Sequence, residues 1–332
     1  MTTSDIAVSG LHRAFGEKVV LDGISFDVAA GSVFSMLGPN GAGKTTTVNI
    51  LTTLIKADAG TVRVAGHDVA TETKAVRAAI GVTGQFAAVD ELLSGRENLQ
   101  LIADLKRVRS GDRVVTQLLD LFDLMESADK LTSTYSGGMR RKLDLAMTLV
   151  GNPQIIFLDE PTTGLDPRSR RTMWEIVREL VADGTTIFLT TQYLEEADQL
   201  ADRIAVLDQG RLIAQGTPQE LKRQIPGTHV RLRFAGLPEL DAAVRVLPGA
   251  TRDDQELTLR VPSEGDSTSL RALLDRLDDY TIHATEFSVH TPDLDDVFLA
   301  LTGHADTGHA NTGHSNTDHA NTGHSNTGVN AQ

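Results

Sequence analysis

A glycine-rich loop at residues 38–45, GPNGAGKT, is a stretch whose residue types and spacing could bind phosphate. It follows the apolar run VFSML (33–37) and precedes a helical pattern, which is the context that the pattern G-x-x-x-x-G-K-[ST] requires. Glycine lets backbone N–H groups turn toward phosphate oxygens, and the following helix N-terminus adds partial positive charge. We expect Lys44 to reach the β- and γ-phosphates of a nucleotide and the Thr45 hydroxyl to bind Mg²⁺. A chance glycine-rich turn would not require the lysine, the threonine and both flanks. The predicted phosphate-binding residues are Gly38, Pro39, Asn40, Gly41, Ala42, Gly43, Lys44, Thr45 and Thr46.

Two adjacent carboxylates end the apolar run IIFLD (155–159). Asp159 stands at the end of a buried strand, where it could hold Mg²⁺ through water, and Glu160 follows at the sheet edge. A carboxylate in that position can orient and polarise an attacking water, so Glu160 is a predicted catalytic residue. A solvated loop is the alternative, but four apolar residues lead directly into the pair.

A second anion-binding helix start is indicated by Ser136, Gly137 and Gly138, which precede the helical segment MRRKLDLAMTLV. One chain thus carries two phosphate-binding helix termini. They are useful together if two chains pair head to tail, with each chain completing the nucleotide site of the other.

In order along residues 4–222, these motifs resemble the ATP-binding domain of ABC transporters. GPNGAGKT resembles Walker A, YSGGM (135–139) the signature motif, and IIFLDE Walker B with the catalytic glutamate. The resemblance implies ATP and Mg²⁺ as cofactors, with Lys44 acting in catalysis. It also implies that Phe15 stacks on adenine, that Gln85 contacts the metal and reports nucleotide state to a membrane subunit, and that Asp166 belongs to the D-loop. For Phe15, an ordinary core aromatic is the alternative.

Gln192 stands at the end of the apolar strand TIFLT, where the family usually has a histidine that hydrogen-bonds the γ-phosphate. Glutamine keeps an N–H₂ donor of similar reach but loses the option of positive charge. We therefore expect a working but modest ATPase in which Gln192 acts as a catalytic donor. A sheet-edge polar residue bound only to water is the alternative.

Four segments are expected to position these residues. Residues 1–222 alternate apolar runs with helical patterns and predict an α/β fold with a parallel sheet. The resemblance specifies this fold as a P-loop NTPase, an ABC-type nucleotide-binding domain with a helical subdomain. Residues 223–228 form a linker around Pro226 and Gly227. Residues 229–302 predict a small α+β domain of βαββα type that ends in the helix DLDDVFLALT, and the histidine-containing repeat at 303–332 predicts a disordered tail.

Composition limits the remaining possibilities. The formal net charge of −14 argues against a nucleic-acid partner, which needs basic surface. The absence of cysteine excludes disulfides and thiolate chemistry and fits a reducing cytoplasm. No apolar run approaches the ~20 residues of a membrane-spanning helix, and the first ten residues lack the features of a secretory signal. Any membrane role is expected to come through a partner.

Within the ABC family, the runs TTQYLEEADQLADRIAVLDQGRLIAQGTP and TPDLDDVFLALTG are similar to the daunorubicin/doxorubicin resistance ATP-binding proteins. This resemblance implies a homodimer on the cytoplasmic face of the bacterial plasma membrane, peripheral through a separate permease, that exports hydrophobic drugs or antibiotics. Export of lipid, polysaccharide or ion cargo is an open alternative, as are import and a non-hydrolysing nucleotide sensor. A soluble ATPase acting on nucleic acid or the ribosome would usually carry two ATP-binding domains in one chain.

Overall fold

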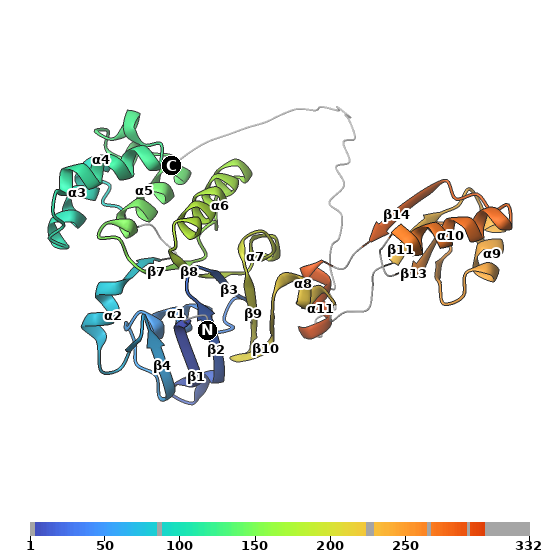
Figure 1. The fold of residues 1–332 in the computed structure, drawn as a ribbon, viewed down its shortest axis with the longest axis horizontal. Helices are drawn as coiled ribbons and strands as arrows, with labels where there is room; N and C mark the ends of the chain where they lie inside the picture. Colours follow the sequence, from blue (N-terminus) through green and yellow to red (C-terminus); the bar gives the residue numbers. More distant parts are fainter. Residues whose placement is uncertain (1–3, 85–87, 224–228, 264–266, 291–292, 303–332) are drawn as a thin grey trace, which may run out of the picture.

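The computed structural model describes residues 4–84, 88–223, 229–263, 267–290 and 293–302. Its first unit contains two sheets (Figure 1). The central sheet has the order β10-β9-β3-β8-β7-β6, and its strands are parallel except β10, which runs antiparallel to β9. Its strands are β3 (Val33–Leu37), β6 (Ile80–Thr83), β7 (Ile155–Asp159), β8 (Thr186–Thr191), β9 (Arg203–Asp208) and β10 (Arg211–Gly216). The predicted parallel sheet is confirmed, and the apolar runs at 33–37 and 155–159 have the predicted bounds.

The second sheet of this unit is antiparallel, with the order β2-β1-β4-β5. Its strands are β1 (Ser4–Phe15), β2 (Lys18–Ala29), β4 (Ala59–Val64) and β5 (His67–Asp68). The two sheets meet through aromatic rings: the ring centroid of Phe26 in β2 lies 5.1 Å from that of Phe34 and 5.9 Å from that of Phe188, both in the central sheet. Such aromatic pairs contribute about 0.5–1.5 kcal/mol each beyond the burial of their area.

The central strands are apolar at nearly every position because each one faces two cores. In β7, Ile155 and Phe157 pack toward the antiparallel sheet, whereas Ile156 and Leu158 pack toward the helices. Successive side chains of a strand point to opposite faces, so a strand covered on both sides needs apolar residues throughout. The first polar residue, Asp159, therefore marks the carboxyl edge of the sheet.

Helices α5 (Gly137–Leu149) and α6 (Pro167–Ala182) cover the central sheet on the face away from the antiparallel sheet, whereas α1 (Lys44–Leu51) packs in the core between the two sheets. Figure 1 shows α3, α4 and α5 gathered at one end of the unit, as the predicted helical subdomain requires. The α3 helix begins with a capping box, in which Glu97 N–H donates to Ser94 Oγ and Ser94 N–H donates to the Glu97 carboxylate. The helices of the unit are α1 (Lys44–Leu51), α2 (Thr73–Ala79), α3 (Gly95–Leu105), α4 (Gly111–Leu121), α5 (Gly137–Leu149), α6 (Pro167–Ala182), α7 (Leu194–Leu200) and α8 (Pro218–Arg223), with short 3₁₀ turns η1 (Met125–Ser127) and η2 (Thr132–Thr134).

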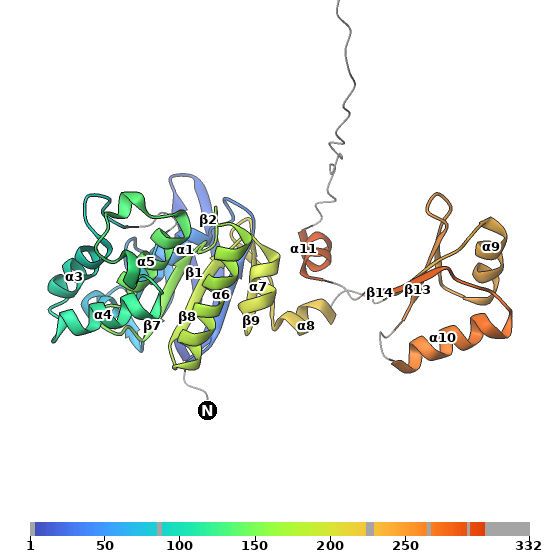
Figure 2. The ribbon, with the colours of Figure 1, turned by 90° about the horizontal axis from the view of Figure 1, so that it is seen from above.

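The accessory domain has its own core and a four-stranded antiparallel sheet (Figure 2). Along the chain its elements follow the pattern βαββαβ, and the sheet order is β12-β13-β11-β14. This is the ferredoxin-like arrangement, with one more strand than the predicted βαββα pattern. The elements are β11 (His229–Arg233), α9 (Leu237–Val246), β12 (Thr251–Asp253), β13 (Thr258–Pro262), α10 (Ser267–Asp279) and β14 (Glu286–His290).

The last helix, α11 (Leu294–Thr302), does not complete the accessory domain as the sequence predicted. Its buried Leu294 and Val297 join a core with Leu37, Ala197 and Leu221 of the first unit. The apolar stripe of α11 is therefore covered by α7 and α8 rather than by the accessory sheet. Along the chain, the accessory domain is inserted between α8 and α11. Both of these helices pack on the ATPase unit. The linker residues 224–228 and the predicted disordered tail at 303–332 lie outside the described residues.

Candidate functional site

The predicted site residues from three neighbouring strands come together at one edge of the central sheet. The order β3-β8-β7 places the loop after Leu37, the end of β8 at Thr191 and the end of β7 at Asp159 side by side. Gly38 N–H donates to Thr191 O at 3.3 Å, and Glu160 N–H donates to Thr190 O at 3.1 Å. Because the strands are parallel, their carboxyl ends share this edge, which is where ligands bind in open α/β sheets.

Two glycines of the loop at 38–45 are required by their surroundings. A Cβ atom on Gly38 would lie 2.2 Å from Leu207 O, which is too close for any side chain. Gly43 has φ of 113°, and a Cβ there would lie 2.9 Å from Val20 O of β2. The loop thus passes tightly between β2 and β9 before α1 begins at Lys44.

Lys44 is held at the base of this loop. It is 5% exposed, and its Nζ donates to Gly38 O at 2.8 Å and to Pro39 O at 3.2 Å. The same Nζ lies 3.4 Å from Glu160 Oε1. Lys44 and Glu160 stand 116 positions apart in the chain and were predicted from separate motifs. The fold brings them within ion-pair distance.

Oxygen donors that fit a magnesium ion lie beside this pair. Thr45 Oγ1 donates to Asp159 Oδ1 at 3.5 Å, and Thr190 Oγ1 donates to the same carboxylate oxygen. Mg²⁺ prefers oxygen ligands and is usually bound by one or two carboxylates together with substrate phosphates. The hydroxyl of Thr45 and the carboxylate of Asp159 are therefore a suitable donor set for Mg²⁺ beside a nucleotide.

Glu160 occupies a strained backbone conformation. Its φ is 48°, in the left-handed region, which costs a non-glycine residue about 1–3 kcal/mol and persists where the surroundings enforce it. The N–H bond to Thr190 holds the backbone, and Thr163 Oγ1 donates to Glu160 Oε2 at 3.3 Å. The side chain is 8% exposed and is directed toward Lys44. Such strain is typical of functional sites.

Gln192 follows β8 directly, at the same edge as Asp159 and Glu160. Its side chain is half-buried. The next residue, Tyr193, is the N-cap of α7, and the Arg170 guanidinium of α6 lies 5.1 Å from its ring centroid. This position agrees with the predicted location at the sheet edge.

Phe15 ends β1 and is 48% exposed, which excludes the core aromatic considered above. The Arg13 guanidinium lies 4.6 Å from the Phe15 ring centroid. The hairpin that carries Phe15 continues into β2, whose Val20 contacts the loop at Gly43. The exposed ring of Phe15, on a hairpin that contacts the phosphate loop through Val20, is available to stack on a base.

The signature segment, defined here as Ser136–Gly138, lies at the exposed N-terminus of the 13-residue helix α5. Ser136 caps the helix by accepting from Met139 N–H at 3.2 Å. Asp166 caps α6, where Ser169 Oγ donates to it at 2.6 Å, and the Ser169 hydrogen bonds lower the pKa of Asp166. A Cβ on Gly138 would lie 2.7 Å from Ser169 Oγ, so the signature segment packs against the start of α6. Gln85 lies outside the described residues.

Buried charged residues that were not predicted from the sequence also lie in the site region, among them Glu196 and Arg141. Glu196 of α7 is fully buried, and its Oε1 accepts from Thr162 Oγ1 at 2.8 Å and from Trp174 Nε1 at 3.2 Å. Burial raises the pKa of Glu196. Arg141 of α5 is 7% exposed. The sequence carries a signal for Glu196. It stands next to Ala197 and one turn before Leu200, on the apolar face of a predicted helix, where burial is expected.

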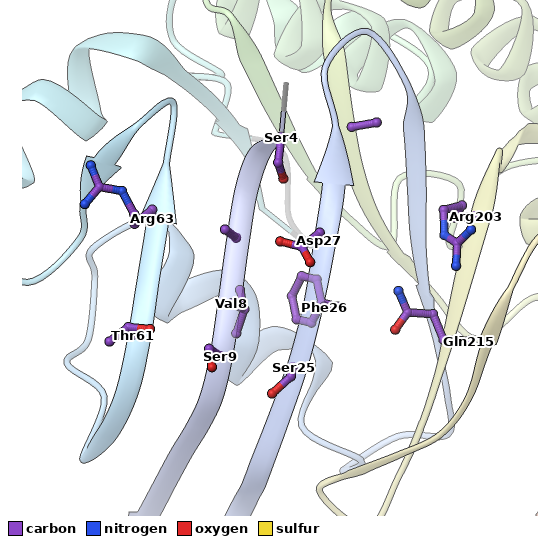
Figure 3. Close-up of a pocket in the computed structure, with 12 residues that line it drawn as sticks. Ser4, Val8, Ser9, Ser25, Phe26, Asp27, Thr61, Arg63, Arg203 and Gln215 are labelled. Atoms are coloured by element: carbon purple, nitrogen blue, oxygen red, sulfur yellow. The ribbon is translucent and has the colours of Figure 1, made fainter. Parts of the chain in front are cut away.

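A separate hollow of about 590 Å³ lies beside the antiparallel sheet and is lined by residues of β1, β2 and β4 together with Arg203 of β9 and Gln215 of β10 (Figure 3). Ser9 and Ser25 lie between Arg63 on one side and Arg203 with Gln215 on the other. The buried Val8 and Phe26 also line the hollow. None of the predicted site residues lines this hollow, so it is distinct from the loop at 38–45.

Comparison with known proteins assigns the family. Residues 21–163 match the ABC transporter family, and residues 216–302 match the family described as ATP-binding protein DrrA1-3-like, C-terminal domain. The chain is 48% identical over 307 residues to the daunorubicin resistance ATP-binding protein DrrA3 of Streptomyces coeruleorubidus, covering 91% of this chain and 97% of the relative. The chain belongs to the ATP-binding proteins of ABC transporters. The C-terminal match spans both α8 and α11, which pack together.

Other relatives of this ABC transporter ATP-binding protein agree with the assignment. The doxorubicin resistance ATP-binding protein DrrA of Mycobacterium tuberculosis is 42% identical, over 90% of this chain and 93% of the relative. The Nod factor export ATP-binding protein I of Rhizobium sp. is 38% identical, over 91% of this chain and 98% of the relative. A solved ATP-binding subunit of an ABC transporter superposes with a TM-score of 0.61 at 28% identity, covering 67% of this chain and 93% of that structure.

Family membership confirms three predictions for this ABC transporter ATP-binding protein. The ATPase unit has the predicted fold, the chain binds ATP, and the chain is an ATP hydrolase of the transporter type. Among the described helices, none combines the length and the apolar character needed to span a bilayer.

Proposed function

We propose that this chain hydrolyses ATP with Mg²⁺ to energise export of hydrophobic, anthracycline-like drugs through a separate membrane permease. The observation that carries the catalytic part is the convergence of Lys44 with Glu160 at 3.4 Å and of Thr45 with Asp159 at 3.5 Å. The cargo is supported by the 48% identity to a daunorubicin resistance protein, which extends over 91% of the chain.

The proposed division of roles follows from this geometry. Backbone N–H groups of the loop and Lys44 bind the phosphates, while Thr45 and Asp159 hold Mg²⁺. When bound, Mg²⁺ neutralises charge on the β- and γ-phosphates. Glu160 orients the attacking water, and the Gln192 amide donates to the γ-phosphate. Phe15 stacks on adenine, and Gln85 retains its predicted role at the metal.

The exposed signature segment supports a head-to-tail homodimer. Ser136 and Gly137 lie at the surface, and the adjacent Gly138 packs against Ser169 at the start of α6. A helix N-terminus that faces outward can bind the γ-phosphate of a nucleotide held by a second chain. We place this dimer at the cytoplasmic face of the bacterial plasma membrane, peripheral through the permease.

A second candidate differs in its cargo. The 38% identity to a Nod factor export ATP-binding protein over 91% of the chain favours a different exported compound on the same ATPase. This candidate requires the same site and predicts normal ATP hydrolysis without drug efflux.

Replacing Gln192 with alanine is expected to lower the rate of ATP hydrolysis. Loss of one donor to a developing anion costs on the order of 10²–10³ in rate at well-ordered sites. Gln192→His should restore a donor and introduce a pH dependence near the ordinary histidine pKa of about 6.5, which the wild type should lack. Phosphate release measured between pH 5.5 and 8.5 tests both expectations. A Gln192→Ala rate equal to wild type would exclude the γ-phosphate role.

The transport proposal is tested by drug retention in cells that express this chain with its membrane partner. Cells with the wild-type chain should retain less of a fluorescent anthracycline than cells with Glu160→Gln, because efflux requires hydrolysis. Equal retention, together with normal ATPase activity of the purified wild type, would contradict drug export and favour the second candidate.

A further inference from the structure

A buried ion pair lies on α5, close behind the signature segment. Arg141 is 7% exposed and Asp144 is 3% exposed, and Arg141 Nη1 lies 3.3 Å from Asp144 Oδ2. The two residues follow Ser136 by five and eight positions on one continuous helix. A movement of the helix N-terminus would therefore carry the pair with it.

The Arg141 guanidinium binds backbone groups of two other segments. Its Nη1 donates to Gly84 O at 2.7 Å, just after β6. Its Nε donates to Pro161 O at 2.9 Å, and its Nη2 donates to Asp159 O at 3.3 Å. These two carbonyl groups belong to the residues on either side of Glu160. Arg141 thus fixes the backbone that carries the proposed catalytic carboxylate.

Asp144 extends the same network. Its Oδ1 accepts from Ala88 N–H at 3.0 Å, while its Oδ2 faces Arg141. Gly84 and Ala88 stand on either side of residues 85–87, so the pair contacts the chain before and after that segment. One buried pair therefore joins the helix of the signature segment, the chain after β6 and the chain after β7.

Stability alone does not account for such a pair. Taking two charges out of water costs several kcal/mol per ion, and replacing a buried pair by apolar residues is often neutral or stabilising. The planar guanidinium offers five donors in a fixed geometry, which suits simultaneous bonds to three carbonyl groups and a carboxylate. Arg141 therefore holds the three segments in a fixed relative position.

We propose that Arg141, oriented by Asp144, is a positioning residue that couples engagement of the signature segment to placement of Glu160. This inference rests on the proposed catalytic role of Glu160. When a γ-phosphate binds at Ser136, α5 shifts with its ligand, and Arg141 transmits the shift to the carbonyl groups of Asp159 and Pro161. Hydrolysis is thereby linked to closure of the dimer, while ATP binding at Lys44 is not.

The test separates binding from turnover. In Arg141→Met, kcat should fall by about 10–100-fold, the size expected for a misplaced catalytic group, and the Kd for ATP should stay within about twofold of wild type because the loop at 38–45 is untouched. Arg113→Met, an exposed arginine on α4, is the matched control and should change neither quantity. Arg141→Lys keeps the charge beside Asp144 but loses the planar fork, so it should show the same split with a smaller fall in kcat.

Hydrogen exchange supplies a readout that loss of stability would not reproduce. ATP should protect amides of α1 equally in wild type and Arg141→Met, but protection at Ala88 and at residues 137–140 should be lost in the variant. An unchanged kcat, or equal losses of kcat and ATP affinity in both Arg141→Met and Arg141→Lys, would overturn the inference. An inactive wild type would instead contradict the proposed function.

Discussion

Glu160→Gln should abolish multiple-turnover ATP hydrolysis while leaving ATP binding intact. The Glu160 carboxylate lies 3.4 Å from Lys44, on a backbone with φ of 48°. Glutamine has the shape of glutamate, so it can occupy this place without disturbing the loop at 38–45. A positioned general base contributes on the order of 10²–10⁴-fold to rate, and the amide cannot accept a proton. Removing a negative charge beside the γ-phosphate should also leave ATP affinity unchanged or raise it. Phosphate release and equilibrium ATP binding measure the two effects.

Glu175→Gln is the matched control for this substitution. Glu175 lies exposed on α6 and takes no part in the site, so its hydrolysis rate should equal that of wild type. Undiminished turnover in Glu160→Gln would assign the water-activating role to another group.

Lys44→Ala should lose ATP affinity by about 10²-fold or more. The lysine is 5% exposed, and its removal leaves the Glu160 carboxylate buried without its cation at the point where phosphate binds. Removing one partner of a buried charge pair costs about 3–5 kcal/mol. The phosphates of the nucleotide lose the same positive charge. Titration with a fluorescent ATP analogue measures the effect.

The control for Lys44→Ala is Lys74→Ala, which removes an exposed lysine from α2 and should bind ATP normally. Thermal unfolding of both variants checks that the fold persists. Wild-type affinity in a folded Lys44→Ala protein would contradict the assignment of the phosphate site.

Much of the ATPase unit could be predicted because its signals are local. The runs at 33–37 and 155–159 are apolar throughout, and the structure shows two cores that cover them. Gly38 and Gly43 are fixed by contacts with Leu207 and Val20, yet the loop pattern alone identified them. Local sequence also predicted that Ser136 stands at a helix start, although its contribution to a second chain remains a proposal.

The parts that could not be predicted depend on contacts between distant segments. The spacing of apolar residues in α11 predicts an apolar face. Only the fold shows that α7 and α8 cover this face. The three residues of β12 are too few for a pattern of alternation. Arg141 binds carbonyl groups of Gly84, Asp159 and Pro161, and backbone carbonyl groups leave no trace in side-chain patterns.

The central claim, that two chains complete each other's ATP sites, is tested most directly by mixing two inactive variants. Lys44→Ala removes the phosphate loop of its own site. Ser136→Asp keeps a helix-capping residue but places a negative charge where the partner's γ-phosphate would bind. Each variant alone should be inactive.

An equimolar mixture should recover about a quarter of wild-type ATP hydrolysis, because half of the dimers are mixed and one of their two sites is intact. The control mixture of Lys44→Ala with the double variant Lys44→Ala/Ser136→Asp contains no intact site and should stay inactive. Recovery in the first mixture alone is the predicted result. No recovery in either mixture, with dimers present in both, would contradict the composite site.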